Sequence, residues 1–416
     1  MSQLNDEQSI ALNRIVEWLT EETSNFFMLK GSAGTGKTFC IKELTDRNPG
    51  KFAYTAPTNK ATKVLRESVT TQSYRPLCRT IYSLLCLTLS NDGEIKKLRV
   101  PKDPVDLSIY NLIIVDEASM ISKDLFAQIE LAAVKYSVRF LFMGDPAQLP
   151  PINENSSRVW EIGASATLTK VMRHDNAILE LATRLRDEVD NAVPKVHLAA
   201  NNDGEIGVWR YDKIAFEHNI KEHAKSGKFS KPDGSKVIAW RNVRVNIFNK
   251  MIRDIIFTPD TPAWVAGDRA LFASVVKDRY GMVLAAIDDE GVVVNAEVSD
   301  MDGFKAWYLD IELDDGRVVL ANPLHADSIA AYEERLRIFA EEARSRERKW
   351  QDYWDLKEHY SDMKYAYAIT AHRSQGSTYD TAFVCWQDIL RNQDANEAYR
   401  CLYVACTRPR SKLILS

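Results

Sequence analysis

A glycine-rich segment near the start of the chain constrains the fold more than any other feature. Residues 31–38 read Gly-Ser-Ala-Gly-Thr-Gly-Lys-Thr, which matches the phosphate-binding pattern G-x-x-x-x-G-K-[ST]. The apolar run 26–30 before it predicts a buried strand, and the residues from 37 onward predict a helix. A strand, a loop and a helix in this order are the setting that a P-loop needs. A turn that binds no phosphate is therefore the weaker interpretation.

The chemistry of a P-loop gives roles to individual residues. Backbone N–H groups of the loop and the N-terminus of the following helix bind phosphate oxygens. We expect Lys37 to reach the β- and γ-phosphates of ATP, and the Thr38 hydroxyl to bind Mg²⁺. The expected ATP contacts in the loop are Gly31, Ala33, Gly34, Thr35, Gly36, Lys37 and Thr38.

Two further predicted strands end at residues that suit phosphate chemistry. The apolar run 112–115 is typical of a central strand in a parallel sheet, and Asp116 and Glu117 follow it directly. Asp116 is expected to hold Mg²⁺, and Glu117 is expected to polarise the attacking water. The apolar run 140–143 leads to a loop with Gln148, whose amide is expected to contact the γ-phosphate and the water. Alternatively, Asp116 and Glu117 are two solvated acids at a strand end, and Gln148 is an ordinary loop amide. The P-loop earlier in the chain makes these alternatives weaker.

Length and composition limit the class of protein. The 416 residues predict two to four domains, and 45% apolar with 27% charged residues is ordinary for a globular protein. We find no run of eighteen apolar residues and no secretory leader. We therefore expect a cytoplasmic protein, in the host cytoplasm if the source is viral, with no membrane partner. The six cysteines include no C-x-x-C pair, and Cys401 and Cys406 have no histidine at zinc-site spacing, so reduced core thiols are expected.

The net charge counts mildly against a nucleic-acid binder. It is −4, and the pI is near 6.1, whereas such proteins are often basic. A motor that moves along a strand must not be held tightly, however, because each phosphate contact adds salt-dependent grip. The charge is therefore compatible with a motor.

The pattern of elements predicts two α/β units with two insertions. Strands and helices alternate to about residue 170, and a second unit begins near Leu168. Alternation around Asn91-Asp92-Gly93 predicts a β-hairpin, whose apolar candidates for a wedge are Leu89, Ile95 and Leu98. Residues 257–325 predict the short strands of a small β-barrel, and residues 326–359 predict a charged helical segment.

The ordered motifs resemble those of superfamily 1 helicases, in the RecD/Dda branch. Residues 31–38, 115–119 and 144–151 resemble motifs I, II and III of this family. Residues 55–61, 79–83, 368–377 and 402–408 resemble motifs Ia, Ib, V and VI. The similarity extends from Gln8 to Arg410. It implies an α/β fold with two RecA-like P-loop motor domains, each built on a parallel sheet.

The resemblance also implies a division of the chain. The first motor domain takes residues 1–83 and 105–167, and a β-hairpin pin at 84–104 interrupts it. The second motor domain takes residues 168–256 and 361–416, and a β-barrel and helical insertion at 257–360 interrupts it.

Further nucleotide-site residues follow from the resemblance. Gln8 corresponds to a glutamine that reads the adenine edge, although Asn5 and Gln8 also fit a capping box. Arg173 and Arg408 correspond to arginine fingers that the second motor domain presents to the γ-phosphate. The alternative role for each arginine is a surface salt bridge. This alternative is stronger for Arg173 than for Arg408. Two more residues are implied in the same cleft, Gln375 and Gly376.

Seven positions correspond to nucleic-acid contacts of the family. Hydroxyls and amides suit phosphate and sugar, and aromatic rings can stack on bases. Asn59 and Tyr82 depart from the histidines that are common in this branch. Trp354 is either a stacking platform for a base or part of an aromatic face that packs the insertion. The positions are Thr58, Asn59, Thr80, Tyr82, Thr370, His372 and Trp354.

Together these inferences predict a DNA helicase that depends on ATP and Mg²⁺. It would move along single-stranded DNA, from 5′ to 3′ as the resemblance implies, and separate forked duplex DNA as a monomer. A single-strand-binding or replication protein is a further candidate partner. Two alternatives stay open: a nucleotide-switched subunit or translocase that does not unwind DNA by itself within a larger DNA-processing complex, and an RNA-directed helicase.

Overall fold

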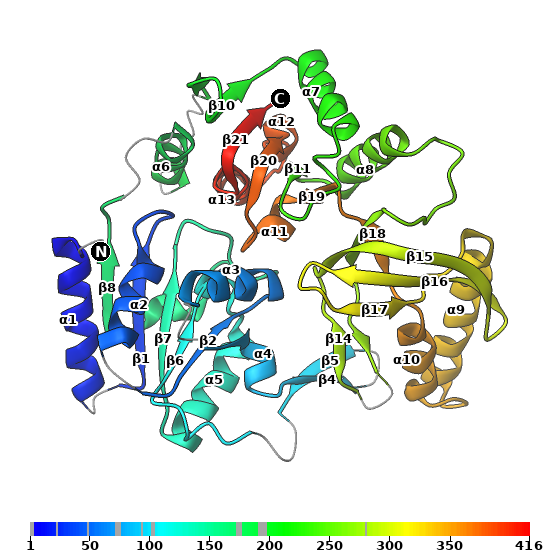
Figure 1. Cartoon of the computed structure of the whole chain (residues 1–416). Coiled ribbons are helices and arrows are strands. Elements are labelled where there is room, and N and C mark those ends of the chain that lie inside the picture. Colours follow the sequence, from blue (N-terminus) through cyan, green and yellow to red (C-terminus); the bar gives the residue numbers. More distant parts are fainter. Residues whose placement is uncertain are drawn as a thin grey trace.

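The chain folds into two α/β domains and a third, mainly antiparallel part. The computed structural model describes residues 4–21, 24–47, 50–70, 76–92, 95–100, 105–171, 177–189, 198–278 and 281–416. In Figure 1 the first domain is mainly blue to cyan, the second is green and orange to red, and the third part is mainly yellow, with orange in α10 and β18. Helix α3 (Asn59–Val69) lies where the three parts meet.

The first domain is built on a six-stranded sheet in which all neighbours are parallel. In spatial order its strands are β3 (Leu77–Thr80), β2 (Phe52–Ala56), β6 (Leu112–Val115), β7 (Arg139–Gly144), β1 (Phe26–Gly31) and β8 (Ser165–Leu168). Its helices besides α3 are α1 (Asp6–Thr20), α2 (Lys37–Arg47), α4 (Ile81–Leu84) and α5 (Lys123–Tyr136). The predicted buried strands are found here.

Helices cover both faces of this first sheet. Phe27 and Leu29 of β1 pack on one face against α1, α2 and α3, whereas Met28 packs on the other face against α4 and α5. Because side chains alternate along a strand, both faces can be apolar only if both are covered. The continuous apolar runs of the sequence therefore have their physical explanation in this sandwich.

The second domain repeats the plan with a second six-stranded sheet. In spatial order its strands are β19 (Ala368–Thr370), β11 (Ser235–Ala239), β20 (Tyr379–Val384), β21 (Pro409–Leu415), β10 (Gly207–Arg210) and β9 (Asn201–Asn202). All neighbours are parallel except β9 and β10. The helices are α6 (Ala177–Val189), α7 (Lys213–Lys225), α8 (Asn242–Ile256), α11 (Ala371–Ser374), α12 (Trp386–Ile389) and α13 (Ala395–Cys406). The predicted two-domain α/β architecture is confirmed.

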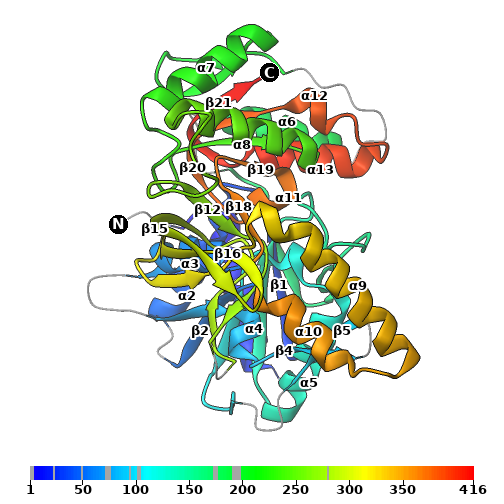
Figure 2. The same cartoon turned by 90° about the vertical axis from the view of Figure 1, so that its right-hand side faces the viewer.

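The insertion in the second domain carries a five-stranded antiparallel sheet. The order is β17 (Val318–Ala321), β16 (Phe304–Leu313), β15 (Glu290–Met301), β12 (Arg269–Phe272) and β18 (Met363–Tyr365). A small pair, β13 (Val276–Lys277) and β14 (Val283–Ala285), precedes β15. Two helices, α9 (Ile329–Ser345) and α10 (Trp350–His359), lie between β17 and β18 in the chain, and they lie side by side in Figure 2.

The hairpin expected between motifs Ib and II is present. Strands β4 (Thr88–Asp92) and β5 (Ile95–Arg99) are antiparallel, with Thr88 opposite Arg99 and Asp92 opposite Ile95. Strand β4 lies beside α10 of the insertion. Of the three wedge candidates, Leu98 is half-buried, and the side chains of Leu89 and Ile95 lie outside the described part of the structure.

Within the described residues, no helix is both long enough and apolar enough to span a membrane. Three short 3-10 segments complete the regular structure of that part: Ala118–Met120, Arg158–Glu161 and Ala326–Ser328.

Candidate nucleotide and nucleic-acid site

The glycine-rich loop joins β1 to α2 in the geometry that phosphate binding needs. Gly34 and Gly36 have φ of +81° and +83°, in the left-handed region where a side chain is strained. The Lys37 ammonium folds back over the loop, where it donates to the carbonyl oxygens of Gly31 (2.7 Å) and Ser32 (3.1 Å). The loop thus holds its lysine close to the expected phosphate position.

Gln8 serves two purposes at once. Its side-chain oxygen accepts from Asn5 N (3.0 Å) and Asn5 Oδ1 accepts from Gln8 N (2.8 Å), which is the capping box of α1. Its Nε2 donates to the carbonyl oxygen of Thr35 in the loop (3.0 Å), and the residue is only 2% exposed. A Cβ on Gly36 would approach Gln8 Nε2 to 2.4 Å, so glycine is needed there. Adenine reading by Gln8 stays a prediction.

Asp116 and Glu117 follow β6 as expected and lie near Lys37. Asp116 Oδ1 accepts from the backbone N of Glu117 (2.8 Å), and Glu117 has φ of +50°. Burial raises the pKa of Asp116, although Lys37 opposes this. Burial and the neighbouring Asp116 raise the pKa of Glu117 to about 7, against the effect of Arg408 and Lys37. Two crowded carboxylates and the Thr38 hydroxyl are oxygen ligands, which Mg²⁺ prefers.

Side chains from both motor domains meet beside these acids. Gln375, after α11, donates through Nε2 to Ser119 Oγ (2.9 Å) and to Gln148 Oε1 (3.1 Å). Ser119 Oγ also lies 3.4 Å from Gln148 Oε1. Gly376 follows with φ of +75°, and a Cβ there would approach the Cβ of Ala61 to 2.9 Å. The cleft between the domains is therefore closely packed at these motifs.

Helix α13 holds the loop that carries Gln148, a role that sequence reasoning missed. Tyr403 donates to the fully buried Asp145, and Arg400 donates to the carbonyl oxygens of Pro146 and Gln148, the latter at 2.8 Å. Arg400 and Tyr403 are three residues apart, so they share one face of the helix. Only this spacing of Arg400 and Tyr403, at the start of motif VI, could have indicated the role.

Arg408 lies just beyond α13, where its charge acts on Glu117. Its guanidinium donates to the carbonyl oxygens of Val404 (2.9 Å) and Ser377 (3.1 Å) and to Thr407 Oγ1 (2.8 Å). It is 6% exposed, and its positive charge lowers the pKa of Glu117. The surface salt bridge considered for Arg408 therefore does not describe it. Arg173 lies outside the described residues.

Three of the predicted nucleic-acid contacts share one structural role. Thr58, Thr80 and Thr370 are the N-caps of α3, α4 and α11. Each hydroxyl accepts a backbone N–H of the first turn: Ala61 at 3.2 Å, Ser83 at 3.1 Å and Arg373 at 3.3 Å. Phosphate groups are commonly bound beside such backbone N–H groups.

The remaining predicted contacts are engaged within the protein. Asn59 Nδ2 donates to both carboxylate oxygens of Asp289 in the insertion (2.9 and 3.0 Å). Tyr82 is half-buried beside the core of the first domain. Trp354 is 6% exposed, with the Lys357 ammonium 4.9 Å from its ring centroid. This burial favours the packing role over the stacking platform.

His372 has partners that the spacing of the sequence did not suggest. Its Nε2 lies 3.1 Å from Glu397 Oε1, and its Nδ1 lies 3.9 Å from Cys401 Sγ. No histidine stands at zinc-site spacing from Cys401 in the sequence, but α11 and α13 pack together and bring His372 next to it. The cysteines of the chain are all free thiols, as expected.

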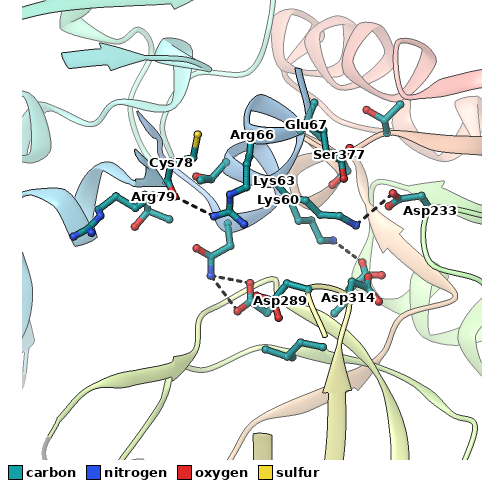
Figure 3. A pocket seen from close by; sticks show the side chains of 18 of the residues that line it. Lys60, Lys63, Arg66, Glu67, Cys78, Arg79, Asp233, Asp289, Asp314 and Ser377 are labelled. Atoms are coloured by element: carbon teal, nitrogen blue, oxygen red, sulfur yellow. Dashed lines mark hydrogen bonds and ion pairs between the residues drawn. The ribbon is translucent and has the colours of Figure 1, made fainter. Parts of the chain in front are cut away.

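A pocket of about 470 Å³ lies between α3, the second domain and the insertion. Asn59 and Thr80 line it, together with the basic residues Lys60, Lys63 and Arg66. Figure 3 shows these cations on one side and Asp233, Asp289 and Asp314 on the other. The pocket therefore has a basic wall and an acidic wall.

Comparison with known proteins agrees with this geometry. The sequence matches the AAA domain over residues 3–205 and the UvrD-like helicase C-terminal domain over residues 365–416. It is 24% identical over 460 residues to the ATP-dependent DNA helicase Dda of Enterobacteria phage T4, covering 98% of each chain. It is 23% identical over 492 residues to the uncharacterized protein R530 of Acanthamoeba polyphaga mimivirus, covering 98% of this chain and 99% of that protein.

The fold also has a solved counterpart. The Pif1 helicase from Bacteroides, in complex with ADP-AlF3 and ssDNA, has a TM-score of 0.52 and 16% identity, covering 100% of this chain and 93% of that one. At this identity the likeness concerns the fold, and it agrees with two RecA-like domains. The resemblance to superfamily 1 helicases that the motifs predict is confirmed.

Proposed function

We propose that this chain, a Pif1/Dda-like helicase of superfamily 1, is an ATP-dependent DNA helicase that moves from 5′ to 3′ along single-stranded DNA. The observation that carries the proposal is the meeting of both motor domains at one phosphate site. Gln375 of the second domain bonds to Gln148 of the first, and the charge of Arg408 acts on Glu117. ATP bound at the P-loop would lie between these groups, so its hydrolysis would alter how the domains fit.

The residues of the P-loop and of motif II fit ATP with Mg²⁺. Lys37 would exchange its two loop carbonyls for phosphate oxygens, which carry more negative charge. Thr38 and Asp116 would hold the metal, whose charge offsets that of the phosphates when it is bound. Glu117 would orient and polarise the attacking water, and its raised pKa suits a group that takes up a proton. Arg408 would stabilise the negative charge that develops on the transferred phosphoryl group.

The same contacts give a route from the nucleotide to the strand. Gln375 follows α11, whose N-cap is Thr370 and whose second residue is His372. A shift of Gln375 relative to Gln148 would therefore move Thr370 and His372, the residues of the second domain that are expected to contact nucleic acid. Thr58 and Thr80 would hold the strand on the first domain, so the two grips would alternate as the cleft closes and opens.

Strand separation is proposed at the hairpin of β4 and β5. The hairpin projects from the first domain, and β4 lies beside α10 of the insertion, which supports it from outside the motor. Forked duplex DNA is the partner that suits such a pin. We propose a monomer that acts in the cytoplasm, in the host cytoplasm if the source is viral, with a single-strand-binding or replication protein as a candidate partner.

Unwinding of two duplexes tests the proposal, one with a 5′ tail and one with a 3′ tail, each with ATP and Mg²⁺. We expect the 5′-tailed duplex alone to open. Opening of only the 3′-tailed duplex would support the motor activity but contradict the 5′ to 3′ direction. Opening of neither duplex, with ATP hydrolysis still stimulated by a single strand, would contradict strand separation.

A further inference from the structure

Three consecutive acids of the insertion, Asp288, Asp289 and Glu290, face the motor domains; we call them the acidic turn. They connect β14 to β15. The backbone N of Asp289 donates to Ala286 O (3.2 Å), Asp288 N donates to Phe272 O (2.8 Å), and Phe272 N donates to Asp289 O (3.0 Å). The turn is thus fixed to the insertion, and it can leave the motor only if the insertion moves with it.

Each acid contacts a different motor-domain residue. Both carboxylate oxygens of Asp289 accept from Asn59 Nδ2, and Glu290 Oε1 lies 2.5 Å from Lys60 Nζ. Asp288 Oδ1 lies 3.3 Å from Arg373 Nη1 of α11. The turn therefore bridges both motor domains, and Figure 3 shows Asp289 opposite α3 with Lys60 beside it.

Glu290 is held further by one lysine of the second motor domain and by one arginine of its own insertion. Its Oε2 accepts from Lys236 Nζ (2.8 Å) and Arg269 Nη2 (3.1 Å), and Arg269 belongs to the insertion. Burial works to raise the pKa of Glu290, but Lys236, Lys60 and Arg269 outweigh it and hold that pKa well below its usual range. Glu290 therefore keeps its charge and two cationic partners even without Lys60.

The contact of Asp288 is the weakest of the three. Asp288 Oδ1 and Arg373 Nη1 are both buried and, within the described part of the chain, neither has a hydrogen-bond partner. Burial also raises the pKa of Asp288, which is consistent with a carboxylate that is incompletely compensated for lost water. A ligand whose anionic oxygens accept a well-aligned hydrogen bond from Arg373 can replace such a contact at low cost.

The motor-domain partners sit next to the predicted grips on nucleic acid. Asn59 and Lys60 follow Thr58 in the first turn of α3, and Arg373 follows His372. Lys63 and Arg66 extend the positive charge along α3, and Arg79 adds to it from β3. Phosphodiester oxygens carry the same charge as carboxylates and bind lysine and arginine in the same way.

We propose that Asn59, Lys60 and Arg373 form a phosphodiester-binding site that the acidic turn covers, and that a single strand binds by displacing the turn. The inference rests on the proposed function, because the ligand is the backbone of single-stranded DNA. The acidic turn acts as a competitor built into the fold. Displacing it separates the turn from Asn59 and Lys60 of the first motor domain and from Arg373 of the second.

Neutralising the turn tests the competition. The variant Asp288→Asn/Asp289→Asn keeps the shape of both side chains and weakens their hold on Asn59 and Arg373. We expect it to bind labelled oligothymidine about fivefold more tightly in fluorescence anisotropy, since a partly exposed ion pair is worth up to about 1 kcal/mol. The matched control Asp300→Asn/Glu312→Gln changes net charge equally at exposed positions of the same insertion, and its affinity should equal that of the wild type. Unchanged affinity of the first variant, or equal tightening of the control, overturns the competition.

Removing the cations tests the site itself. Lys60→Ala and Arg373→Ala should each weaken binding and reduce the slope of log affinity against log salt by about 0.7, the value for one phosphate contact on a single strand. Lys305→Ala, an exposed lysine of the insertion, is the control and should change neither quantity. Unchanged affinity and slope in both variants would overturn the site. Thermal melting checks that each variant is folded.

These outcomes separate the inference from the proposed function. A wild-type chain that binds no single strand would overturn both. If single-stranded DNA stimulates ATP hydrolysis by the wild type, and every turn and cation variant binds the strand as the wild type does, only the covered site is overturned. The helicase function would still be supported.

Discussion

Gln375 of the second motor domain donates a hydrogen bond of 3.1 Å to the side-chain oxygen of Gln148 in the first. Both side chains are buried, and Ser119 joins the same group. Gln148 follows the strand that ends beside the phosphate site, whereas Gln375 follows the helix that Thr370 caps. One buried pair thus links the nucleotide cleft to the expected nucleic-acid grip.

The Gln375→Ala variant tests this link. It removes the amide donor that Gln148 and Ser119 share, and loss of a buried hydrogen-bond partner typically costs about 1–3 kcal/mol. We expect the strand-stimulated kcat for ATP hydrolysis to fall by about tenfold or more. The double variant Gln148→Ala/Gln375→Ala should be little slower than either single variant, since the two residues act together. Fully additive losses, or an equal loss in the exposed control Gln387→Ala, would contradict the link.

Lys37→Ala should abolish ATP hydrolysis while the chain stays folded and still binds single-stranded DNA. The ammonium lies over the P-loop, and no other lysine of the described residues donates to the loop carbonyls. Hydrolysis is measured by phosphate release, and binding by anisotropy. Lys42→Ala, one turn further along α2, is the matched control and should hydrolyse ATP normally. Retained turnover in Lys37→Ala would remove the P-loop assignment.

Arg408→Ala should keep ATP binding and lose hydrolysis by about a thousandfold, in the range found for arginine fingers. Arg408→Lys keeps the charge but not the planar fork, so an intermediate rate is expected. Arg410→Ala removes a half-exposed arginine two residues away that pairs with Asp233 and Asp380, and it should remain active. Full activity of Arg408→Ala would contradict the arginine-finger role. The guanidinium would then serve only the structure, through its contacts with Val404 and Ser377.

Asp116→Asn should raise the Mg²⁺ concentration needed for half-maximal ATP hydrolysis. The substitution removes one negative charge from the pair of half-buried carboxylates and so weakens attraction for a divalent cation. A titration of the rate with Mg²⁺ measures the effect, and chelation with EDTA should stop hydrolysis while single-strand binding persists. The exposed Asp124→Asn is the control. Identical Mg²⁺ curves for Asp116→Asn and wild type would contradict the metal role.

Local patterns sufficed for the elements of the motor. The strand before the P-loop, the helix after it and the strand before Asp116 lie where the sequence predicts them, because burial on both faces and helical spacing are properties of neighbouring residues. Thr58, Thr80 and Thr370 share a capping role because such threonines begin helices. The capping box of Asn5 and Gln8 is confirmed because it too depends on neighbouring residues, whereas adenine reading by Gln8 stays a prediction.

Contacts between domains could not be predicted in the same way. Asn59 and Asp289 are 230 positions apart, and so are Lys60 and Glu290. No periodicity connects such residues, and a carboxylate in a turn looks the same whether it faces water or a lysine. The contacts of Arg400 and Tyr403 with the Gln148 loop could not be predicted, because their partners are backbone carbonyls and a buried acid of the other motor domain. The acidic turn therefore became visible only with the structure.

Trp354 shows how burial decides between two roles that the sequence left equal. Its ring is almost fully buried, meets Tyr353 edge to face, and has Lys357 over it. If it packs the insertion, Trp354→Ala should lower the free energy of unfolding by about 3 kcal/mol, as expected for a buried tryptophan. Trp354→Phe should recover much of that loss.

Single-strand binding gives the second readout for this residue. A packing role predicts that folded Trp354→Phe binds oligothymidine as the wild type does, because no stacking face is lost. A stacking platform predicts the reverse: weaker binding, since a base stacked on an aromatic ring contributes about 1–3 kcal/mol, with an unchanged melting temperature. Chemical denaturation and anisotropy on the same two variants therefore distinguish the roles. A loss of affinity for oligothymidine without a loss of stability would show that Trp354 contacts nucleic acid.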